Sequence, residues 1–124
     1  MNFEFQIDAD EVPSLTLMQY LPAILESNNV DVLRVPRVNT VEGLTQEHIQ
    51  KWRWAVDSRG RVNWPDMQWR IYRNDPRIRW EGNVHEKIIG HATHAILPLE
   101  EDLALQHIKT IERQEKQNNY YETL

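Results

Sequence analysis

Residues 3–11 read Phe-Glu-Phe-Gln-Ile-Asp-Ala-Asp-Glu, and this stretch decides how the rest of the chain is interpreted. Apolar and polar residues alternate from Phe3 to Ile7, which predicts a half-buried strand that ends at an acidic cluster. In an extended segment, side chains two residues apart share a face, with Cα atoms roughly 6–7 Å apart. The carboxylates of Asp8 and Asp10 can therefore approach one divalent cation, and such hard oxygen ligands suit Mg²⁺ or Mn²⁺.

Two other interpretations of the acidic cluster start from the same residues. The first is a solvated acidic turn that precedes a helix capped by Ser14. The second is a calcium-binding EF-hand loop, which requires Asp or Asn at its fifth position and Gly at its sixth. Val12 and Pro13 occupy those positions, so the calcium loop is excluded and the acidic turn stays open.

The remaining periodicities predict alternating strands and helices. A helix follows Ser14, with Pro22 expected to kink or split it, and a second strand over 30–35 is expected to stop at Pro36. The later part is expected to contain a helix over 44–56 capped by Thr45, strands over 67–72, 78–80 and 95–97, and a helix from about Glu101 onward. The order β-α-β followed by a less regular part predicts an α/β fold, α+β in its second part, in a single domain over 1–124.

Charge is unevenly distributed along the chain. Residues 51–80 contain eight Lys or Arg against three Asp, a net charge of +5, and all five Trp. Since the whole chain carries −5, the remainder carries −10. An Arg- and Trp-rich segment suits anionic ligands, sugars or nucleic acid, whereas the acidic remainder argues against a dedicated nucleic-acid protein. The absence of cysteine excludes disulfides and thiolate metal sites.

Three separated segments together resemble family 2 glycosyltransferases of the GT-A type. Residues 7–14, Ile-Asp-Ala-Asp-Glu-Val-Pro-Ser, are similar to the family's Asp-x-Asp motif. Residues 68–74, Gln-Trp-Arg-Ile-Tyr-Arg-Asn, and 78–86, Ile-Arg-Trp-Glu-Gly-Asn-Val-His-Glu, resemble its acceptor-side signature. Residues 107–120, with His107, Lys109, Arg113, Lys116 and Tyr120, look like its closing segment.

The resemblance implies a partial GT-A-like, Rossmann-like sheet with an acceptor-side subdomain and a terminal helix. It also implies that Asp10 is the principal ligand of Mn²⁺ or Mg²⁺, that Asp8 lies near the metal or the nucleotide-sugar donor, and that His107 is a further metal ligand. A polar residue at a helix start is the alternative for His107. These three side chains are expected to converge on a cation that binds a diphosphate.

The resemblance places the acceptor pocket around residues 70–86. Glu86 is the candidate general base for an acceptor hydroxyl, and His85 either shares that role or orients Glu86. Trp80 is expected to stack on a sugar, while Arg70 and Arg73 are expected to bind phosphate or shape the pocket. The alternatives are a surface glutamate, a structural histidine, a core tryptophan, and arginines paired with the acidic part of the chain.

The family's nucleotide-binding half is expected before residue 1, which leaves three functional interpretations. The first is an inverting transfer of a sugar from a nucleotide-sugar donor to a glycan or other hydroxyl acceptor, with a second chain or a homo-oligomer completing the site. The second is a non-catalytic remnant or accessory subunit of such an enzyme. The third is an Arg/Trp-rich module that binds nucleic acid or another anionic polymer. Neither a signal peptide nor a membrane-spanning run is found in the sequence, so a cytoplasmic location is expected.

Overall fold

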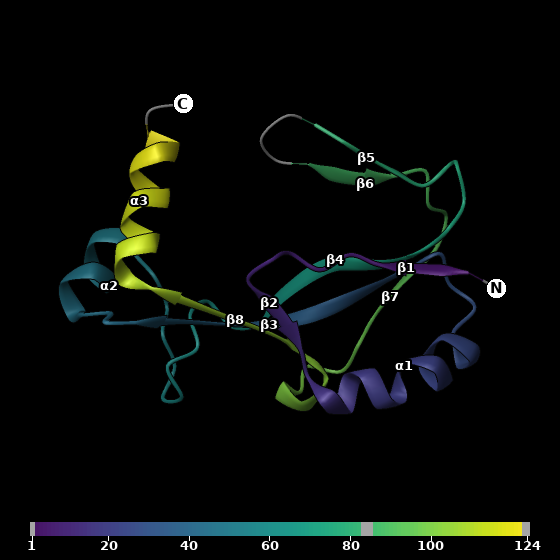
Figure 1. Cartoon of the computed structure of the whole chain (residues 1–124), viewed down its shortest axis with the longest axis horizontal. Helices are drawn as coiled ribbons and strands as arrows, with labels where there is room; N and C mark the ends of the chain where they lie inside the picture. The colour runs from purple at the N-terminus through teal and green to yellow at the C-terminus, as the bar shows by residue number, and fades with distance from the viewer. Residues whose placement is uncertain (1, 83–85, 123–124) are drawn as a thin grey trace.

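The computed structural model describes residues 2–82 and 86–122 of the chain. It is a mixed α/β fold in which a six-stranded mixed sheet, curled into a half-barrel, is accompanied by three α-helices (Figure 1). The strands are β1 (Phe3–Phe5), β2 (Glu11–Pro13), β3 (Val32–Glu42), β4 (Asp66–Arg73), β5 (Arg79–Glu81), β6 (Lys87–Ile89), β7 (His94–Ile96) and β8 (Leu105–Thr110). The helices are α1 (Leu15–Ser27), α2 (Gln46–Trp52), the 3-10 turn η1 (Glu101–Leu103) and α3 (Ile111–Glu122).

The long strand β3 organises the sheet, whose order is β1-β4-β3-β8-β2. One edge of β3 pairs antiparallel with β4, and β1 pairs antiparallel with the far edge of β4. Two parallel strands share the other edge of β3: β7 pairs with Val32–Arg34 and β8 with Arg37–Glu42. Strand β2 completes this side by pairing antiparallel with β8. This arrangement joins the first residues of the chain to residues about a hundred positions later.

Helix α1 covers one end of the sheet. It begins as the sequence predicts, because the Ser14 hydroxyl accepts the backbone N–H of Leu17. Leu17, fully buried, and Leu21 pack against a buried apolar set from the strands and from the residue after β7: Leu33, Val35, Ile71, Leu97 and Leu105. The helix runs unbroken through Pro22, so the expected split does not occur.

A smaller apolar cluster lies on the other side of the sheet. The antiparallel pair β5–β6 lies across the sheet from α1 (Figure 1). Ile78 and Ile88 of this region are buried against Val32 of β3, with Trp69, Tyr72 and Trp80 packed around them. The two clusters therefore hold β3 from both sides near its start.

Two elements differ from the sequence-based expectations. Strand β3 does not stop at Pro36 but continues to Glu42. Pro36 lies between the residues paired with β7 and those paired with β8, where the ladder along that edge is already interrupted. The helix expected from Glu101 is also wrong, because only a 3-10 turn forms at Glu101–Leu103, residues 105–110 form β8, and the α-helix covers Ile111–Glu122. The burial of Leu105 and His107 beside the exposed Ile108 shows the two-residue period of a strand.

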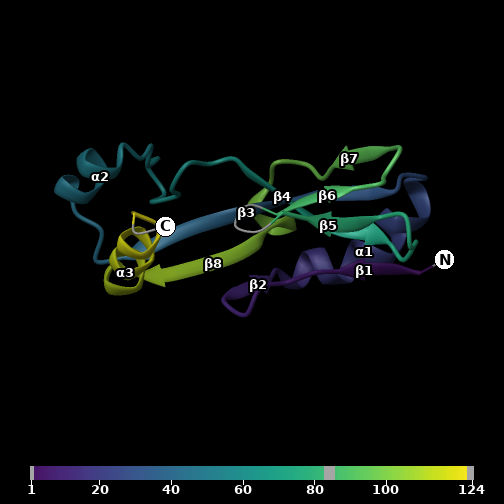
Figure 2. The same cartoon turned by 90° about the horizontal axis from the view of Figure 1, so that it is seen from above.

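Helices α2 and α3 lie together at the end of the molecule away from the N-terminus (Figure 2). Thr45 caps α2 as expected, and the helix ends at Trp52 because Arg53 adopts a left-handed conformation with φ of 56°. His48 of α2 and Glu115 of α3 are joined by a contact of 2.9 Å. Among the described residues, no helix combines the length and apolar character needed to cross a membrane.

Candidate metal and anion site

The pairing of β2 with β8 brings the Asp-x-Asp segment beside His107. In the register of this pair, Glu11 lies opposite His107. A tight turn precedes β2, in which the N–H of Glu11 donates to the carbonyl of Asp8. Asp10 Oδ2 thereby lies 2.9 Å from His107 Nε2, although the two residues are 97 positions apart. His107 is therefore placed by a strand, not by the start of a helix.

Asp8 points to a different partner. Its Oδ2 accepts a hydrogen bond of 3.0 Å from Arg70, and its backbone N–H donates to Glu11 Oε1 at 2.9 Å. The side chain of Asp8 keeps 49% of its surface exposed. Within residues 2–82 and 86–122, no three His, Cys, Asp or Glu side chains are grouped closely enough to hold a metal ion. The structure thus brings together Asp10 and His107, while Asp8 lies with Arg70.

His107 is fixed from behind by polar side chains of β3 and β4. The residue is only 8% exposed. Its Nδ1 lies 2.7 Å from Asn39 Oδ1, and Asn39 Nδ2 donates to Asp66 Oδ2, also at 2.7 Å. Asp66 Oδ2 receives a second hydrogen bond from Arg37 Nε at 3.1 Å. A continuous chain of contacts therefore runs from Asp10 through His107 and Asn39 to Asp66.

Glu11 is the most deeply buried acid of this region, and its side chain has no exposed surface. Its Oε2 lies 2.8 Å from Arg37 and 3.0 Å from Arg70. Burial alone raises the pKa of the Glu11 carboxyl, but hydrogen bonds from Arg37 and the Asp8 backbone, with the charges of both arginines, lower it below its ordinary value. Glu11 is thus a structural carboxylate that supports the segment beside Asp10.

Asp10 is held in its charged form. Partial burial raises the pKa of its carboxyl, but the hydrogen bond and charge of His107, a backbone N–H and the charge of Lys109 outweigh this effect. The resulting pKa lies below the ordinary aspartate value. Arg113 of α3 also approaches Asp10 Oδ2, at 3.5 Å. Asp10 is therefore an ionised carboxylate with His107, Lys109 and Arg113 around it.

A polar cavity of about 300 Å³ opens beside this contact chain. It is lined by residues of β3, β4, β8, α3 and the loop between α2 and β4: Arg37, Asn39, Thr40, Val41, Trp54, Val62, Asn63, Asp66, His107, Lys109, Gln114 and Gln117. Burial, followed by the charges of Arg113 and Arg37, lowers the pKa of the Lys109 ammonium, and Asp10 and Asp8 oppose the shift. Lys109 Nζ donates to Gln117 Oε1. Cationic side chains grouped at a polar cavity suit an anionic ligand.

The two candidate phosphate-binding arginines lie three residues apart on β4 but have different partners. Arg70 is buried and neutralises Asp8 and Glu11. Arg73 lies near the end of α1, where it donates to Asn29 Oδ1 at 2.7 Å and to the carbonyl of Val30 at 3.1 Å. The structure therefore does not bring the two guanidinium groups together.

Among the described candidate acceptor residues, Trp80 lies on β5 and Glu86 directly precedes β6. Trp80 is partly buried against Tyr72, with ring centroids 6.3 Å apart in an edge-to-face arrangement. Glu86 is exposed immediately before β6. His85 lies outside the described residues. Trp80 thus packs on the smaller apolar cluster, on strands other than those that carry Asp10 and His107.

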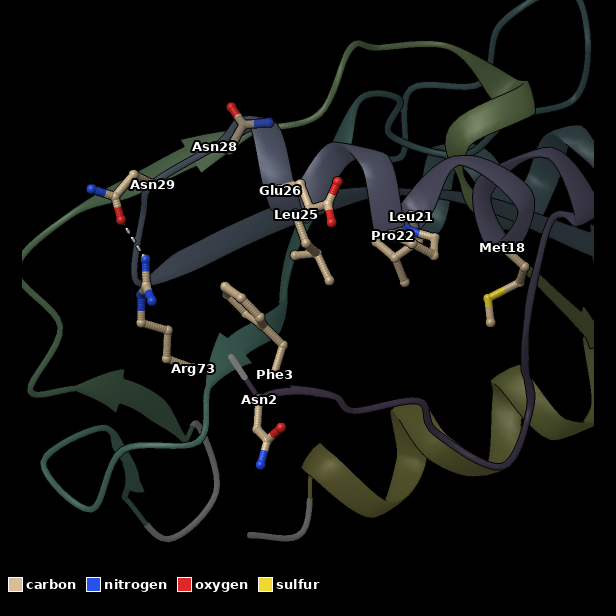
Figure 3. Close-up of a pocket in the computed structure, with 10 residues that line it drawn as sticks. All are labelled: Asn2, Phe3, Met18, Leu21, Pro22, Leu25, Glu26, Asn28, Asn29 and Arg73. Carbon is tan, nitrogen blue, oxygen red and sulfur yellow. Dashed lines mark hydrogen bonds between the residues drawn. The ribbon is translucent and has the colours of Figure 1, made fainter.

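A second concavity, an apolar groove of about 790 Å³, runs along α1 beside β1 (Figure 3). Its walls are Asn2, Phe3, Met18, Leu21, Pro22, Leu25, Glu26, Asn28, Asn29 and Arg73. Strand β1 forms an end of the sheet, so its outer edge carries no neighbouring strand within that sheet. Of the sequence-based site candidates that the structure describes, only Arg73 lines this groove.

Sequence reasoning missed Arg37, Asn39 and Asp66 as parts of the site. They come from residues 30–66, which carry no recognisable motif, and they meet His107 only through the β3–β8 and β3–β4 pairings. Glu11 was visible within the acidic motif, but its burial was not. Comparison with protein-family models, with curated proteins and with solved structures yields no match to this chain.

Proposed function

We propose that this chain is the metal-binding and acceptor-side half of a GT-A-like, family 2 glycosyltransferase. The reaction would transfer a sugar from a nucleotide-sugar donor to a glycan or other hydroxyl acceptor. The observation that supports this most directly is the 2.9 Å contact of Asp10 with His107. It joins the first and last of the three segments that resemble the family, across 97 positions of sequence.

The donor set fits a divalent cation in part. Asp10 and His107 supply one oxygen and one nitrogen ligand, and Mn²⁺ accepts both. Asp8 lies on the donor side, and its exposed carboxylate faces Arg70. When bound, the cation would neutralise the charge of the departing nucleoside diphosphate. Lys109 and Arg113, which both act on Asp10, would add positive charge at the same diphosphate.

The acceptor side is assigned to the β5–β6 pair and its connection. Glu86, or His85, would remove the proton of the acceptor hydroxyl, which requires a base within hydrogen-bond reach of it. Trp80 would limit the pocket as an apolar wall, consistent with its partly buried position. Arg70 would act indirectly by holding Asp8 and Glu11 in place, and Arg73 would act at the groove.

A nucleotide-binding part must complete this enzyme, and the free edge of β1 offers a surface for it. A strand added at that edge would extend the sheet, and apolar side chains beside it would fill the groove along α1. The partner in this proposal is a second chain or a second copy that supplies the nucleotide-binding half. A chain that binds metal and acceptor but does not turn over alone, an accessory subunit, is the second candidate function. The placement of Asp8 on Arg70 favours it.

The anionic-polymer interpretation loses its main support in the structure. Six arginines of residues 51–80 are paired with acids, so the charge asymmetry of the sequence is largely neutralised in the fold. The pairs are Arg59–Glu101, Arg61–Asp57, Arg70 with Asp8 and Glu11, Arg73–Asp31, Arg77–Asp75 and Arg79–Glu81. Salt-dependent binding to oligonucleotides would revive that interpretation.

Calorimetric titration of Mn²⁺ into the full chain tests the metal claim. Asp10→Ala and His107→Ala should each weaken binding by at least about tenfold, because each removes one of two ligands. Glu26→Gln, an exposed acid on α1, is the matched control and should bind as the wild type does. Equal affinity in all four proteins would refute the site. Turnover of a panel of nucleotide sugars by the chain alone would exclude the accessory role.

A further inference from the structure

A group of basic side chains surrounds Trp69, on the side of the sheet away from α1. Trp69 belongs to β4 and packs on the smaller apolar cluster, which includes residues of β5 and β6. The guanidinium carbon of Arg34 lies 4.6 Å from the centroid of its ring. The ring centroids of His91 and His94 lie 5.4 and 5.3 Å from it. Side chains from β3, from the loop between β6 and β7 and from β7 therefore meet at one aromatic ring.

Strand pairing accounts for this meeting. Arg34 lies opposite Trp69 in the β3–β4 register, and Val32 lies opposite His94 in the β3–β7 register. Val32 and Arg34 are two residues apart on β3, so their side chains share a face of the strand. Val32 is buried in the smaller apolar cluster, so Arg34 extends that face towards the solvent.

The loop that carries the histidines is fixed at both ends. Asp31 Oδ2 accepts the backbone N–H of Ala92 at 2.8 Å, and Thr93 Oγ1 accepts the backbone N–H of Asp31 at 3.0 Å. Gly90 has φ of 86°, and a Cβ at this position would lie 1.6 Å from the carbonyl oxygen of Arg77. The loop is therefore held against the residues that precede β3 and those that precede β5, and its position does not depend on a ligand.

The positive charge of Arg34 is not compensated within the described part of the chain. There, no carboxylate lies within ion-pair distance of its guanidinium group, in contrast with six arginines of residues 51–80. Its Nε and the Nδ1 of His91 are buried and have no hydrogen-bond partner. The two terminal nitrogens of Arg34 are not among the buried atoms. Buried polar groups are usually hydrogen-bonded and a guanidinium group always keeps its charge, so this group of side chains needs an anionic acceptor.

We propose that Arg34, with His91 and His94, binds an anionic group, a phosphate or a carboxylate, beside Trp69. A guanidinium group matches both oxyanions with paired N–H donors, and an imidazole adds a further donor. A metal cation does not fit, because Arg34 would repel it. In addition, no third His, Cys, Asp or Glu of residues 2–82 and 86–122 joins the two histidines.

The location of this group specifies the chemical class of the acceptor. Trp80, the proposed apolar wall of the acceptor pocket, packs on the same cluster as Trp69. An acceptor whose anionic group binds Arg34 therefore lies on the same side of the sheet as Trp80. We infer an acceptor that carries a phosphate or a carboxylate beside its hydroxyl group. This assignment rests on the proposed function, whereas binding of the anion does not.

Titration of small sugars into the full chain tests the anion site. Glucose 6-phosphate and glucuronate are the charged probes, and glucose is the uncharged match. The readout is the indole N–H signal of Trp69 in nitrogen-15 correlation spectra, which Trp69→Phe assigns among the five tryptophans. At one pH and ionic strength, a charged probe should shift this signal and glucose should not. A response to only one charged probe identifies the anion. An equal response to glucose, or no response to either charged probe, would overturn the proposal.

Substitutions identify the groups that bind the probe. Arg34→Gln should weaken binding of the charged probe by about tenfold or more, because the charge that binds the oxyanion is removed. Arg59→Gln makes the same change at an exposed arginine after α2 and should bind the probe as the wild type does. Unchanged affinity in folded Arg34→Gln would contradict the proposal. If that variant does not fold, His94→Gln decides, since His94 is exposed, and its affinity should fall. Wild-type affinity in His94→Gln would then count against the site.

Two further variants separate this site from the polar cavity and from the metal claim. Loss of probe binding in Lys109→Gln, with full binding in Arg34→Gln, would place the anion in the polar cavity and refute the site at Trp69. Asp10→Ala should bind the charged probe normally, because the probe requires no metal. Failure of the Mn²⁺ titration with intact probe binding would thus refute the proposed function alone. Intact Mn²⁺ binding without probe binding would refute the anion site alone.

Discussion

The two halves of β3 belong to one strand but are stabilised by different physics. Residues 32–36 are mostly buried among apolar side chains of α1 and β4, where stabilisation comes from surface removed from water. Residues 37–42 carry Arg37 and Asn39, whose neighbours are charged or hydrogen-bonded groups. The apolar half should tolerate substitution by other apolar residues of similar volume. The polar half requires that every hydrogen-bonding partner is present.

The difference explains where function can reside. An apolar core offers no group that can bind a cation, while a buried polar network fixes donors and acceptors in direction. Asp10 and His107 lie at the open end of such a network, with side chains that are 25% and 9% exposed. The molecule thus holds a candidate site by polar contacts at one end of a sheet whose other end is stabilised by apolar burial.

The largest expected effect comes from removing Glu11, the buried acid of β2 that pairs with Arg37 of the polar half. Glu11→Ala removes the buried carboxylate that Arg37 and Arg70 share. It should lower the free energy of unfolding by about 3–5 kcal/mol. Urea denaturation followed by circular dichroism measures it. Glu11→Gln keeps the shape and some hydrogen bonds, so it should cost less. A variant Glu11→Ala as stable as the wild type would show that the network does not contribute to stability.

The corresponding test of the apolar half is Leu17→Ala. Leu17 is fully buried, so truncation should cost about 2–5 kcal/mol through lost burial and the cavity that remains. The same denaturation experiment reports it. Mn²⁺ affinity of the folded variant should stay unchanged, in contrast with Asp10→Ala. A parallel loss of metal affinity would mean that the two halves are coupled.

A smaller effect is expected at acid pH, where protonation of Glu11 and Asp10 should lower the stability of the polar part of the sheet and leave the apolar part unaffected. The pKa values of Glu11 and Asp10 are lowered in the fold, so their contribution is complete above the ordinary values of 4.5 and 3.8. It is lost as the pH falls through the lower folded values. Stability should therefore decrease below about pH 4.5, and Glu11→Gln should flatten the profile. An equally steep profile in Glu11→Gln would assign the acid sensitivity to other carboxylates.

Local sequence signals predicted much of the apolar half. The Ser14 cap, the spacing of Leu17 and Leu21, and the strand at 67–72 each depend on neighbours within a few residues, and the structure has all of them. Predictions failed where a distant partner decides. Residues 105–110 carry apolar side chains at a spacing that also fits a helix, and the free edge of β3 selects a strand. Pro36 is accommodated because the partner strand changes beside it.

The sequence by itself determined the types of residue available: an Asp-x-Asp segment after a short strand, a late histidine, and a likeness to glycosyltransferase motifs. Only the tertiary structure decided that Asp10 meets His107, that Asp8 meets Arg70, and that Asn39 and Asp66 stand behind the imidazole. The physical reason is that strand pairing joins residues without regard to their separation along the chain. A hydrogen bond depends on the distance and direction between two groups in space, and the spacing of residues along the sequence determines neither.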